Sequence, residues 1–187
     1  LFGSADGRTF SEVALPGGSR LTSSTSVADV DGDGYMDIVV GNDGQENQVL
    51  FGSTDGRTFS EVALPGGSSW TYSTSVADVD GDGFVDIVVG NSGEENQILF
   101  GSADGRTFSE VALPGGRRTR STSVADVDGD GFMDIVLGNY EENQVLFGSA
   151  DGRTFSEVAL AGGSRSTGST SVADVDGDGF MDIVLGN

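Results

Sequence analysis

The sequence contains no His, no Cys and no Lys, so its nine basic residues are all Arg. Without Cys there is no disulfide, zinc-thiolate site or thiol nucleophile. Without His there is neither the usual neutral-pH base nor the commonest transition-metal ligand. Without Lys there is no Schiff-base chemistry. These absences speak against most enzyme classes and leave polar chemistry to Asp, Glu, Ser, Thr, Asn and Arg.

Basic charge is scarce as well, since 30 acidic residues give the 187-residue chain a formal net charge of −21. Phosphates need a basic surface, so we expect no nucleic-acid partner and, for the same reason, no membrane partner. Long apolar runs are also missing, because no segment approaches the roughly 18 residues of a membrane span. The start at Leu1 has no initiator Met and no hydrophobic leader, which indicates a removed signal or a piece of a longer chain.

The sequence is rich in internal repetition instead. The strings GRTFSEVAL and STSVADVDGDG each occur four times, and we divide a single domain 1–187 into repeats 1–49, 50–98, 99–145 and 146–187. The near identity of the copies indicates recent duplication or a designed consensus. A period of 47 to 49 residues is typical of β-propeller blades.

Each repeat is predicted to form four short strands and no helix. One set comprises residues 26–30, 37–40, 48–52 and 59–64, separated by Gly-rich turns. This pattern predicts a four-stranded antiparallel meander. Its central strands are apolar on consecutive residues, which indicates that both faces of each sheet are covered. We therefore expect an all-β protein, a β-propeller whose blades stack around a ring.

The most informative motif is D-x-D-G-D-G-x-x-D, which begins at Asp29, Asp78, Asp126 and Asp174. Four carboxylates within nine residues repel one another, whereas a hard divalent cation needs several oxygen ligands at about 2.3 to 2.6 Å. Calcium fits better than magnesium, which demands near-ideal octahedral geometry. An EF-hand is excluded because its twelfth position, a bidentate Glu, is Val40 here. A solvated Asp-Gly turn is the alternative for any single copy.

We therefore predict one Ca²⁺ per repeat, held by the four carboxylates and by the main-chain carbonyl of the residue after the second Gly. The predicted ligands are Asp29, Asp31, Asp33, Tyr35, Asp37, Asp78, Asp80, Asp82, Phe84, Asp86, Asp126, Asp128, Asp130, Phe132, Asp134, Asp174, Asp176, Asp178, Phe180 and Asp182. Four bound ions add eight positive charges, which changes the formal net charge from −21 to −13. Metal binding should then contribute directly to folding.

The acidic motif continues as D-I-V-[VL]-G-N and is followed by N-Q-[VI]-L-F-G, and this combination resembles the FG-GAP and VCBS repeats of integrin-α-like β-propellers. The resemblance covers the whole chain. It implies that each repeat is a propeller blade and that the acidic loop between its first and second strands holds Ca²⁺. The G-A-P string is absent, and Gly41-Asn42 stands in its place, which favours the bacterial VCBS-like branch. In this family the usual function is adhesion or ligand binding.

The copies differ mainly in two segments per repeat. The variable segments are 19–23, 68–72, 117–120 and 164–168, and also 43–45, 92–94 and 140–141. In an antiparallel meander these two connections emerge on one face, and the acidic loop and the Asp-Gly-Arg-Thr hairpin emerge on the other. Aromatic and Arg side chains are favoured in recognition, although surface loops also vary without any function. The ligand candidates on this variable face are Trp70, Tyr72, Tyr140, Arg20, Arg117, Arg118, Arg120 and Arg165.

The repeat pattern leaves half a blade at each terminus, and three closures are open. The two halves could complete a four-bladed ring within one chain, two chains could alternate in an eight-bladed ring, or the chain could belong to a longer array. We expect a homodimer with eight blades, because the open sheet faces would otherwise be exposed to water.

These observations lead us to expect a non-enzymatic, calcium-binding β-propeller that acts as an extracellular binding or adhesion module with a glycan or protein ligand. The alternative is a structural repeat scaffold with no ligand other than calcium. Catalysis by paired carboxylates is disfavoured, because equivalent Asp clusters lack distinct acid and base roles. A secreted, cell-surface or periplasmic location is expected, since external modules bind calcium with Kd of about 10⁻⁴ to 10⁻³ M.

Overall fold

The computed structural model describes residues 1–115, 118–161 and 166–187. In this part of the chain there are sixteen strands and no helix, which confirms the all-β prediction. It follows that the described residues contain no helix with the length and apolarity needed to cross a membrane.

Three four-stranded antiparallel sheets form the body of the molecule, and we call them blades 1, 2 and 3. Blade 1 contains β3 (Thr22–Ala28), β4 (Asp37–Asn42), β5 (Gln48–Gly52) and β6 (Phe59–Ala63). Blade 2 contains β7 (Thr71–Ala77), β8 (Asp86–Asn91), β9 (Gln97–Phe100) and β10 (Ser109–Ala112). Blade 3 contains β11 (Thr119–Ala125), β12 (Asp134–Asn139), β13 (Gln144–Phe147) and β14 (Ser156–Ala159). The predicted meander is confirmed, although its first strand begins and ends earlier than expected.

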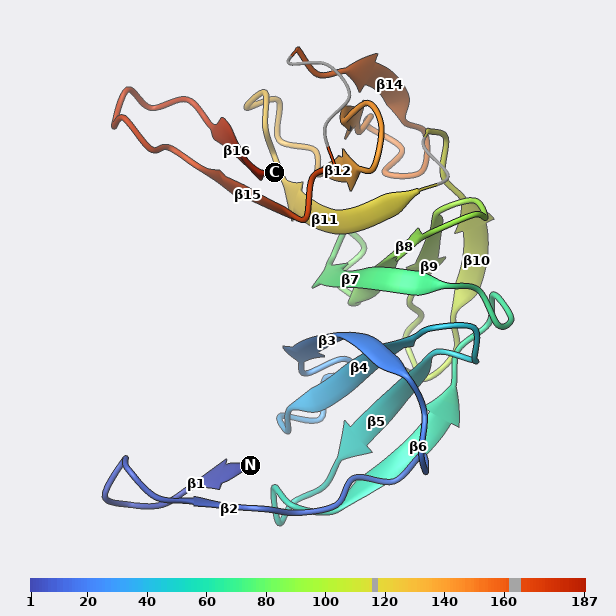
Figure 1. Cartoon of the computed structure of the whole chain (residues 1–187), viewed down its shortest axis with the longest axis vertical. Coiled ribbons are helices and arrows are strands. Elements are labelled where there is room, and N and C mark those ends of the chain that lie inside the picture. Colours follow the sequence, from blue (N-terminus) through green and yellow to red (C-terminus); the bar gives the residue numbers. More distant parts are fainter. Residues whose placement is uncertain (116–117, 162–165) are drawn as a thin grey trace.

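Two smaller sheets complete the fold. The N-terminal half-blade pairs β1 (Phe2–Gly3) with β2 (Phe10–Ser11), and the C-terminal half-blade pairs β15 (Ser169–Ala173) with β16 (Asp182–Gly186). The blades form an open arc, and the two half-blades lie at its opposite ends (Figure 1). The chain therefore does not close a four-bladed ring on itself.

The first strands of successive blades pack against one another along the inner side of the arc, β3 on β7, β7 on β11 and β11 on β15 (Figure 1). Ser and Thr side chains join them. The Thr74 main-chain N–H donates to Ser24 Oγ at 2.9 Å, and Ser26 Oγ donates to the Thr74 carbonyl at 2.8 Å. The recurrent STS string thus connects neighbouring blades by hydrogen bonds that repeat at each interface.

The hydrophobic core lies between the blades. One cluster joins Val39 and Phe51 of blade 1 to Ile87 and Leu99 of blade 2. The other joins blades 2 and 3, with Val88 on the opposite side of the same strand, β8. Blade 2 is therefore covered on both faces, as the consecutive apolar residues predicted.

Candidate functional site

The four acidic motifs form the loops that join the first and second strands of the repeats. We call them acidic loops 1 to 4, and they span residues 29–37, 78–86, 126–134 and 174–182. In acidic loop 1, Gly32 and Gly34 have φ of +71° and +90°, a region that only Gly enters readily. These two glycines turn the chain so that successive Asp side chains converge.

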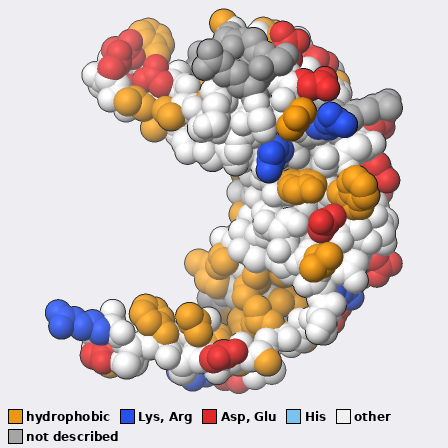
Figure 2. Space-filling model, viewed as in Figure 1, with side chains coloured by type: hydrophobic (Ala, Val, Ile, Leu, Met, Phe, Trp, Pro, Cys, Tyr) orange, Lys and Arg blue, Asp and Glu red, His pale blue; other side chains and the backbone are white. Residues whose placement is uncertain are grey.

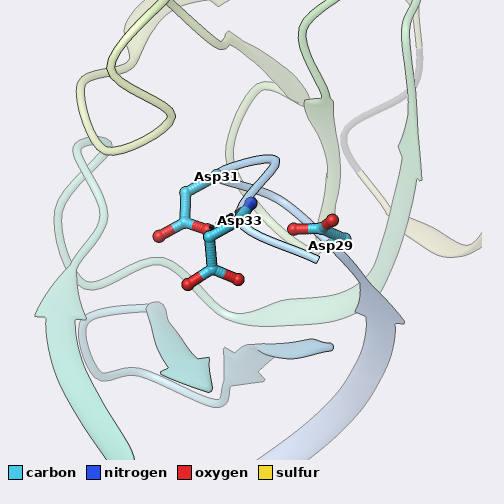
Figure 3. Close-up of side chains that lie close together, drawn as sticks. All are labelled: Asp29, Asp31 and Asp33. Atoms are coloured by element: carbon cyan, nitrogen blue, oxygen red, sulfur yellow. Dashed lines mark hydrogen bonds between the residues drawn. The ribbon is translucent and has the colours of Figure 1, made fainter. Parts of the chain in front are cut away.

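Asp29, Asp31 and Asp33 of acidic loop 1 lie close together (Figure 3), and main-chain N–H groups hold their side chains in place. The Gly34 N–H donates to Asp29 Oδ2 at 2.9 Å, and the Tyr35 N–H donates to Asp33 Oδ1 at 2.8 Å. The Asp33 N–H donates to Asp31 Oδ1 at 3.3 Å. The same three bonds recur in acidic loop 2, so the geometry follows from the motif.

The last Asp of each motif has a different environment, because it starts the second strand and is buried in blades 1 to 3. Asp37 accepts the Val30 N–H on Oδ2 and the Gly52 N–H on Oδ1, both at 2.7 Å. Burial raises the pKa of Asp37 and raises the pKa of the equivalent Asp86 to about 6, against the hydrogen bonds that lower it. These carboxylates tie the acidic loop to the third strand.

Each loop brings three carboxylates together, with one oxygen of each within 4.8 Å of the others. The groups are Asp29, Asp31 and Asp33; Asp78, Asp80 and Asp86; Asp126, Asp128 and Asp134; and Asp174, Asp176 and Asp182. In three of the four loops the closing Asp belongs to the group, and in acidic loop 1 the fifth motif residue takes its place. The predicted carbonyl ligands Tyr35, Phe84, Phe132 and Phe180 each lie two residues after the third Asp of the motif, and the N–H of each donates to that Asp.

Two buried carboxylate oxygens test whether the loops fit a cation. Asp29 Oδ1 and Asp78 Oδ1 are buried and accept no hydrogen bond from any described residue. Burying a carboxylate oxygen without a hydrogen-bond donor is strongly unfavourable unless a cation coordinates that oxygen. In acidic loops 3 and 4 the equivalent oxygens accept the N–H groups of Gly129 and Gly177 instead. The donor set, oxygen only and anionic, fits a hard divalent cation.

An Arg from the neighbouring blade contacts acidic loops 1 and 2, which sequence reasoning missed. Arg106 Nη2, in the β9–β10 hairpin, lies 2.6 Å from Asp31 Oδ2, and Arg153 Nη2, in the β13–β14 hairpin, lies 2.6 Å from Asp80 Oδ2. The recurrence of Asp-Gly-Arg-Thr in every repeat was the available signal, but it did not indicate which Asp is contacted. Because the Arg residues bind Oδ2, the Oδ1 atoms of both Asp residues still face their loops.

The variable segments do share one face. Asp43 forms an isolated antiparallel bridge with Trp70, and Ser92 forms one with Arg118. Each bridge joins the variable segment within one blade to the variable segment that leads into the next. The acidic loops and the Asp-Gly-Arg-Thr hairpins meet elsewhere, through the Arg–Asp contacts, as the meander geometry predicted.

Several ligand candidates surround a pocket of about 350 Å³ on this variable face, between blades 2 and 3. It is lined by Tyr72, Ser92, Arg118, Arg120 and Tyr140. The Arg118 guanidinium lies 5.4 Å from the centre of the Tyr140 ring, and Arg120 Nη1 donates to Ser166 Oγ at 3.1 Å. Hydrophobic and basic side chains are grouped on this side of the molecule, over the middle of the arc (Figure 2). Ser92 belongs to the predicted variable segment 92–94 but is not among the ligand candidates predicted from the sequence.

The other candidates lie outside the pocket. Trp70 is 57% exposed, and its indole lies beside Gly44 of the preceding variable segment. Arg20 is engaged by residues of blade 1, where Nη1 donates to the Glu46 carbonyl at 2.9 Å and Nη2 pairs with Glu61 at 3.0 Å. The two remaining candidates, Arg117 and Arg165, lie outside the described residues.

Comparisons with known proteins agree with this architecture. The model of the FG-GAP-like repeat family matches residues 29–89, 78–137 and 126–185. None of the curated proteins compared with the chain matches it. A similar solved structure is a lectin of Agrocybe aegerita, described as recognising non-reducing terminal N-acetylglucosamine. It is 21% identical with a TM-score of 0.54, over 86% of this chain and 46% of the lectin chain. The chain thus spans about half the length of that lectin, and the likeness shows a shared fold.

Proposed function

Since this chain belongs to the FG-GAP-like repeat family, we propose that it is a non-enzymatic, calcium-binding β-propeller module with a ligand-binding face. The observation that carries the calcium assignment is the pair of buried oxygens, Asp29 Oδ1 and Asp78 Oδ1, which lack donors among the described residues. Each belongs to a group of three converging carboxylates, and such groups occur once per repeat. Catalysis is not supported, because equivalent loops provide no distinct acid and base.

The residues of acidic loop 1 would have different roles in binding the ion. Asp29, Asp31 and Asp33 would supply carboxylate oxygens, and the Tyr35 carbonyl would add a neutral one. Asp37 uses both oxygens for main-chain N–H groups, so its main contribution there would be to hold the loop on the sheet. The ion itself supplies positive charge that offsets the mutual repulsion of the carboxylates.

Calorimetric titration of the calcium-free protein tests this proposal. We expect close to one ion per acidic loop and a higher unfolding temperature with calcium, because the ion binds only the folded loops. Asp29→Asn and Asp78→Asn should each remove one binding event, whereas Glu46→Gln, an exposed acid outside the loops, should remove none. Magnesium in place of calcium should bind more weakly. No heat and no response to a chelator would overturn the calcium assignment.

For the variable face, we propose a glycan or protein ligand that uses the pocket between blades 2 and 3. Tyr72 and Tyr140 offer aromatic surfaces, and Arg118 and Arg120 offer donors for hydroxyl or carboxylate groups. The fold is shared with a lectin, which makes glycans the first ligands to test.

A glycan array with the calcium-loaded protein separates this proposal from the scaffold alternative. A specific signal should be lost in Tyr140→Ala and weakened in Trp70→Ala. It should persist in Met36→Ala, which shortens an exposed apolar side chain on an acidic loop. No signal on glycans or on candidate protein ligands would favour the scaffold. We also propose a secreted, cell-surface or periplasmic location, where calcium is abundant enough for weak sites to be occupied.

A further inference from the structure

Identical hairpins in the four repeats have different surroundings. Gly105 and Gly152 are buried against the neighbouring blade, and a Cβ on them would lie 2.2 and 2.3 Å from the Cα atoms of Asp31 and Asp80. The equivalent Gly7 and Gly56 have nearly the same φ but nothing within 4 Å of that position. The conformation of the hairpin is therefore set locally, and its contact surface is ready in all four repeats.

The Arg residues that follow these glycines also fall into two pairs, one that forms ion pairs with a neighbouring blade and one without such an ion pair among the described residues. Arg106 and Arg153 each pair with an Asp of the preceding blade and stack on a Phe ring at 4.3 Å. Arg8 and Arg57 form no ion pair with any described residue, although Arg57 already lies 5.2 Å from the Phe2 ring. The chain thus presents two arginines with the geometry of an inter-blade contact and no acidic partner.

The matching acidic residues are at the other end of the arc. Asp128 and Asp176 occupy the motif position of Asp31 and Asp80, and both are exposed and bind no Arg among the described residues. A groove of about 690 Å³ adjoins Asp128, with Met133, Phe180 and Met181 among its lining residues. At the equivalent residues of blades 1 and 2, a hairpin of the next blade lies against the acidic loop, with Gly105 and Arg106 at Asp31 and Gly152 and Arg153 at Asp80.

The sheet edges are complementary as well. In blades 1 to 3 the closing Asp accepts an N–H from a Gly at or directly after the end of the third strand, and in blade 1 the Gly52 N–H donates to Asp37 Oδ1 at 2.7 Å. Asp182 is the closing Asp of acidic loop 4 and begins β16. Among the described residues, no third strand pairs with β16 to supply the Gly N–H. On β1, Gly3 is the counterpart of Gly52. The C-terminal half-blade therefore has the Asp acceptor of this hydrogen bond, and the N-terminal half-blade has the Gly donor.

Both ends of the arc also expose side chains that are buried in the complete blades. Leu1 is 84% exposed, whereas its counterpart Leu50 is 2% exposed, and Val184 is 50% exposed, whereas Val39 is fully buried. A hydrophobic area faces the opening of the arc over the first repeat (Figure 2). A groove in the N-terminal part of the chain has Leu15 and Ile38 among its lining residues.

From these observations we infer that the two ends bind a second copy of this chain. β1 of one chain pairs with β16 of its partner and completes a four-stranded blade in the order β15, β16, β1, β2. Arg8 of the partner subunit then reaches Asp128 and Phe147, and Arg57 of the partner subunit reaches Asp176. Acidic loops 3 and 4 thereby acquire the same Arg contact that loops 1 and 2 have within the chain.

The number of copies follows from the repeat count. Residues 1–187 contribute three blades and two half-blades, so copies of this 187-residue chain that close a ring give a multiple of four blades. Four is excluded because the arc of a single chain is open (Figure 1). Eight lies within the usual range of four to eight blades, and twelve lies beyond it. A head-to-tail interface that closes after two copies gives the eight-bladed homodimer.

Sedimentation velocity of the chain in calcium tests the inference. Wild-type protein should have twice the 19.1 kDa chain mass. Arg8→Glu and Arg57→Glu should raise the dissociation constant about 100-fold or more, because each dimer loses two charged pairs and gains repulsion. Arg118→Glu, an exposed charge reversal on the variable face, should remain a dimer. Wild-type protein at one-chain mass would overturn the inference, while calcium titration of the same sample reports separately on the metal sites.

Cysteine cross-linking covers the case in which the charge variants fail to fold. Ile38 pairs with Leu50 across β4 and β5, so Ile183 should lie opposite Leu1 of the partner subunit, within reach of a disulfide. The chain has no native Cys. Leu1→Cys combined with Ile183→Cys should give a covalent two-chain species on mild oxidation. Leu1→Cys combined with Val172→Cys, on the far side of β16, should not; equal cross-linking of both variants would contradict the proposed register.

Discussion

At the scale of single residues, position within the motif decides what each Asp does. Asp29 lies in the loop with one oxygen bonded to Gly34 and the other buried without a donor. Asp86, at the closing position, is fully buried and bonded through both oxygens to main-chain N–H groups. The same side chain therefore offers an open cation ligand at one position and a structural brace at another.

The first prediction concerns Asp86 in calcium-free protein. Burial raises its pKa to about 6, above the value of about 3.9 for an unfolded chain. The folded state therefore binds this proton more tightly. The resulting stability is complete below about pH 3.9 and is lost as the pH rises through about 6. We expect the unfolding temperature in chelator to be higher near pH 5 than near pH 7.

Carbon-13 NMR of the Asp86 carboxyl group measures this titration directly. In chelator its midpoint should lie near 6, and saturating calcium should lower it, because the cation favours the ionised form. A midpoint near 3.9 in chelator would show that burial does not govern this carboxylate.

At the scale of elements, the important contact is between a hairpin of one blade and an acidic loop of the blade before it. The β9–β10 hairpin places Gly105 against the backbone of Asp31, and Arg106 lies between Asp31 and the Phe51 ring. This arrangement couples a candidate metal loop to the packing of the next blade. Residues that contact metal ligands affect the affinity for the metal, because they orient the ligands.

The second prediction compares Gly105→Ala with Gly67→Ala. Both glycines have positive φ, at +64° and +72°, so each substitution should cost about 1–2 kcal/mol from the backbone alone. A Cβ at position 105 would also lie 2.2 Å from the Asp31 Cα, whereas nothing lies within 4 Å at position 67. We expect Gly105→Ala to destabilise by about 1–3 kcal/mol more.

Urea unfolding in calcium provides the comparison, because both variants keep the same charge. Calcium titration of Gly105→Ala should also show weakened binding at acidic loop 1 alone. Equal destabilisation by the two substitutions would mean that the hairpin moves away from the loop at little cost.

At the scale of the whole molecule, excess negative charge opposes the stacking of the blades. The formal net charge is −21, and the described residues contain only a few ion pairs that offset it. Exposed pairs each contribute about 0 to 1 kcal/mol. Repulsion therefore outweighs attraction in the calcium-free chain, and any treatment that screens or neutralises the carboxylates should stabilise the fold.

The third prediction is that sodium chloride raises the unfolding temperature in chelator. Between about 0.01 M and about 1 M salt the Debye length falls from about 30 Å to about 3 Å, so repulsion between acidic loops is screened. In saturating calcium the same increase should have a smaller effect, since fewer charges remain uncompensated. Differential scanning calorimetry checks both arms, and a decrease with salt in chelator would contradict the account.

Most of the fold and part of the candidate site could be predicted from the repeated pattern. Strand identity, the acidic loops and the separation of the two faces depend on neighbours within one repeat, and four near-identical copies confirm each local pattern. The contact between Arg106 and Asp31 could not be predicted, because it joins residues 75 positions apart in different blades. Nor does any motif mark Ser92 as part of the pocket.

The sequence by itself therefore determined what each repeat becomes: a four-stranded meander with a carboxylate loop at one end and variable segments at the other. Turn chemistry and side-chain alternation act over a few residues and are the same in every copy. Only the tertiary structure decided how the repeats relate to one another, which Arg meets which Asp, and that the arc stays open. Those features depend on the angle at which one blade packs on the next. That angle is set by the shapes of side chains meeting across the interface, which no local pattern specifies.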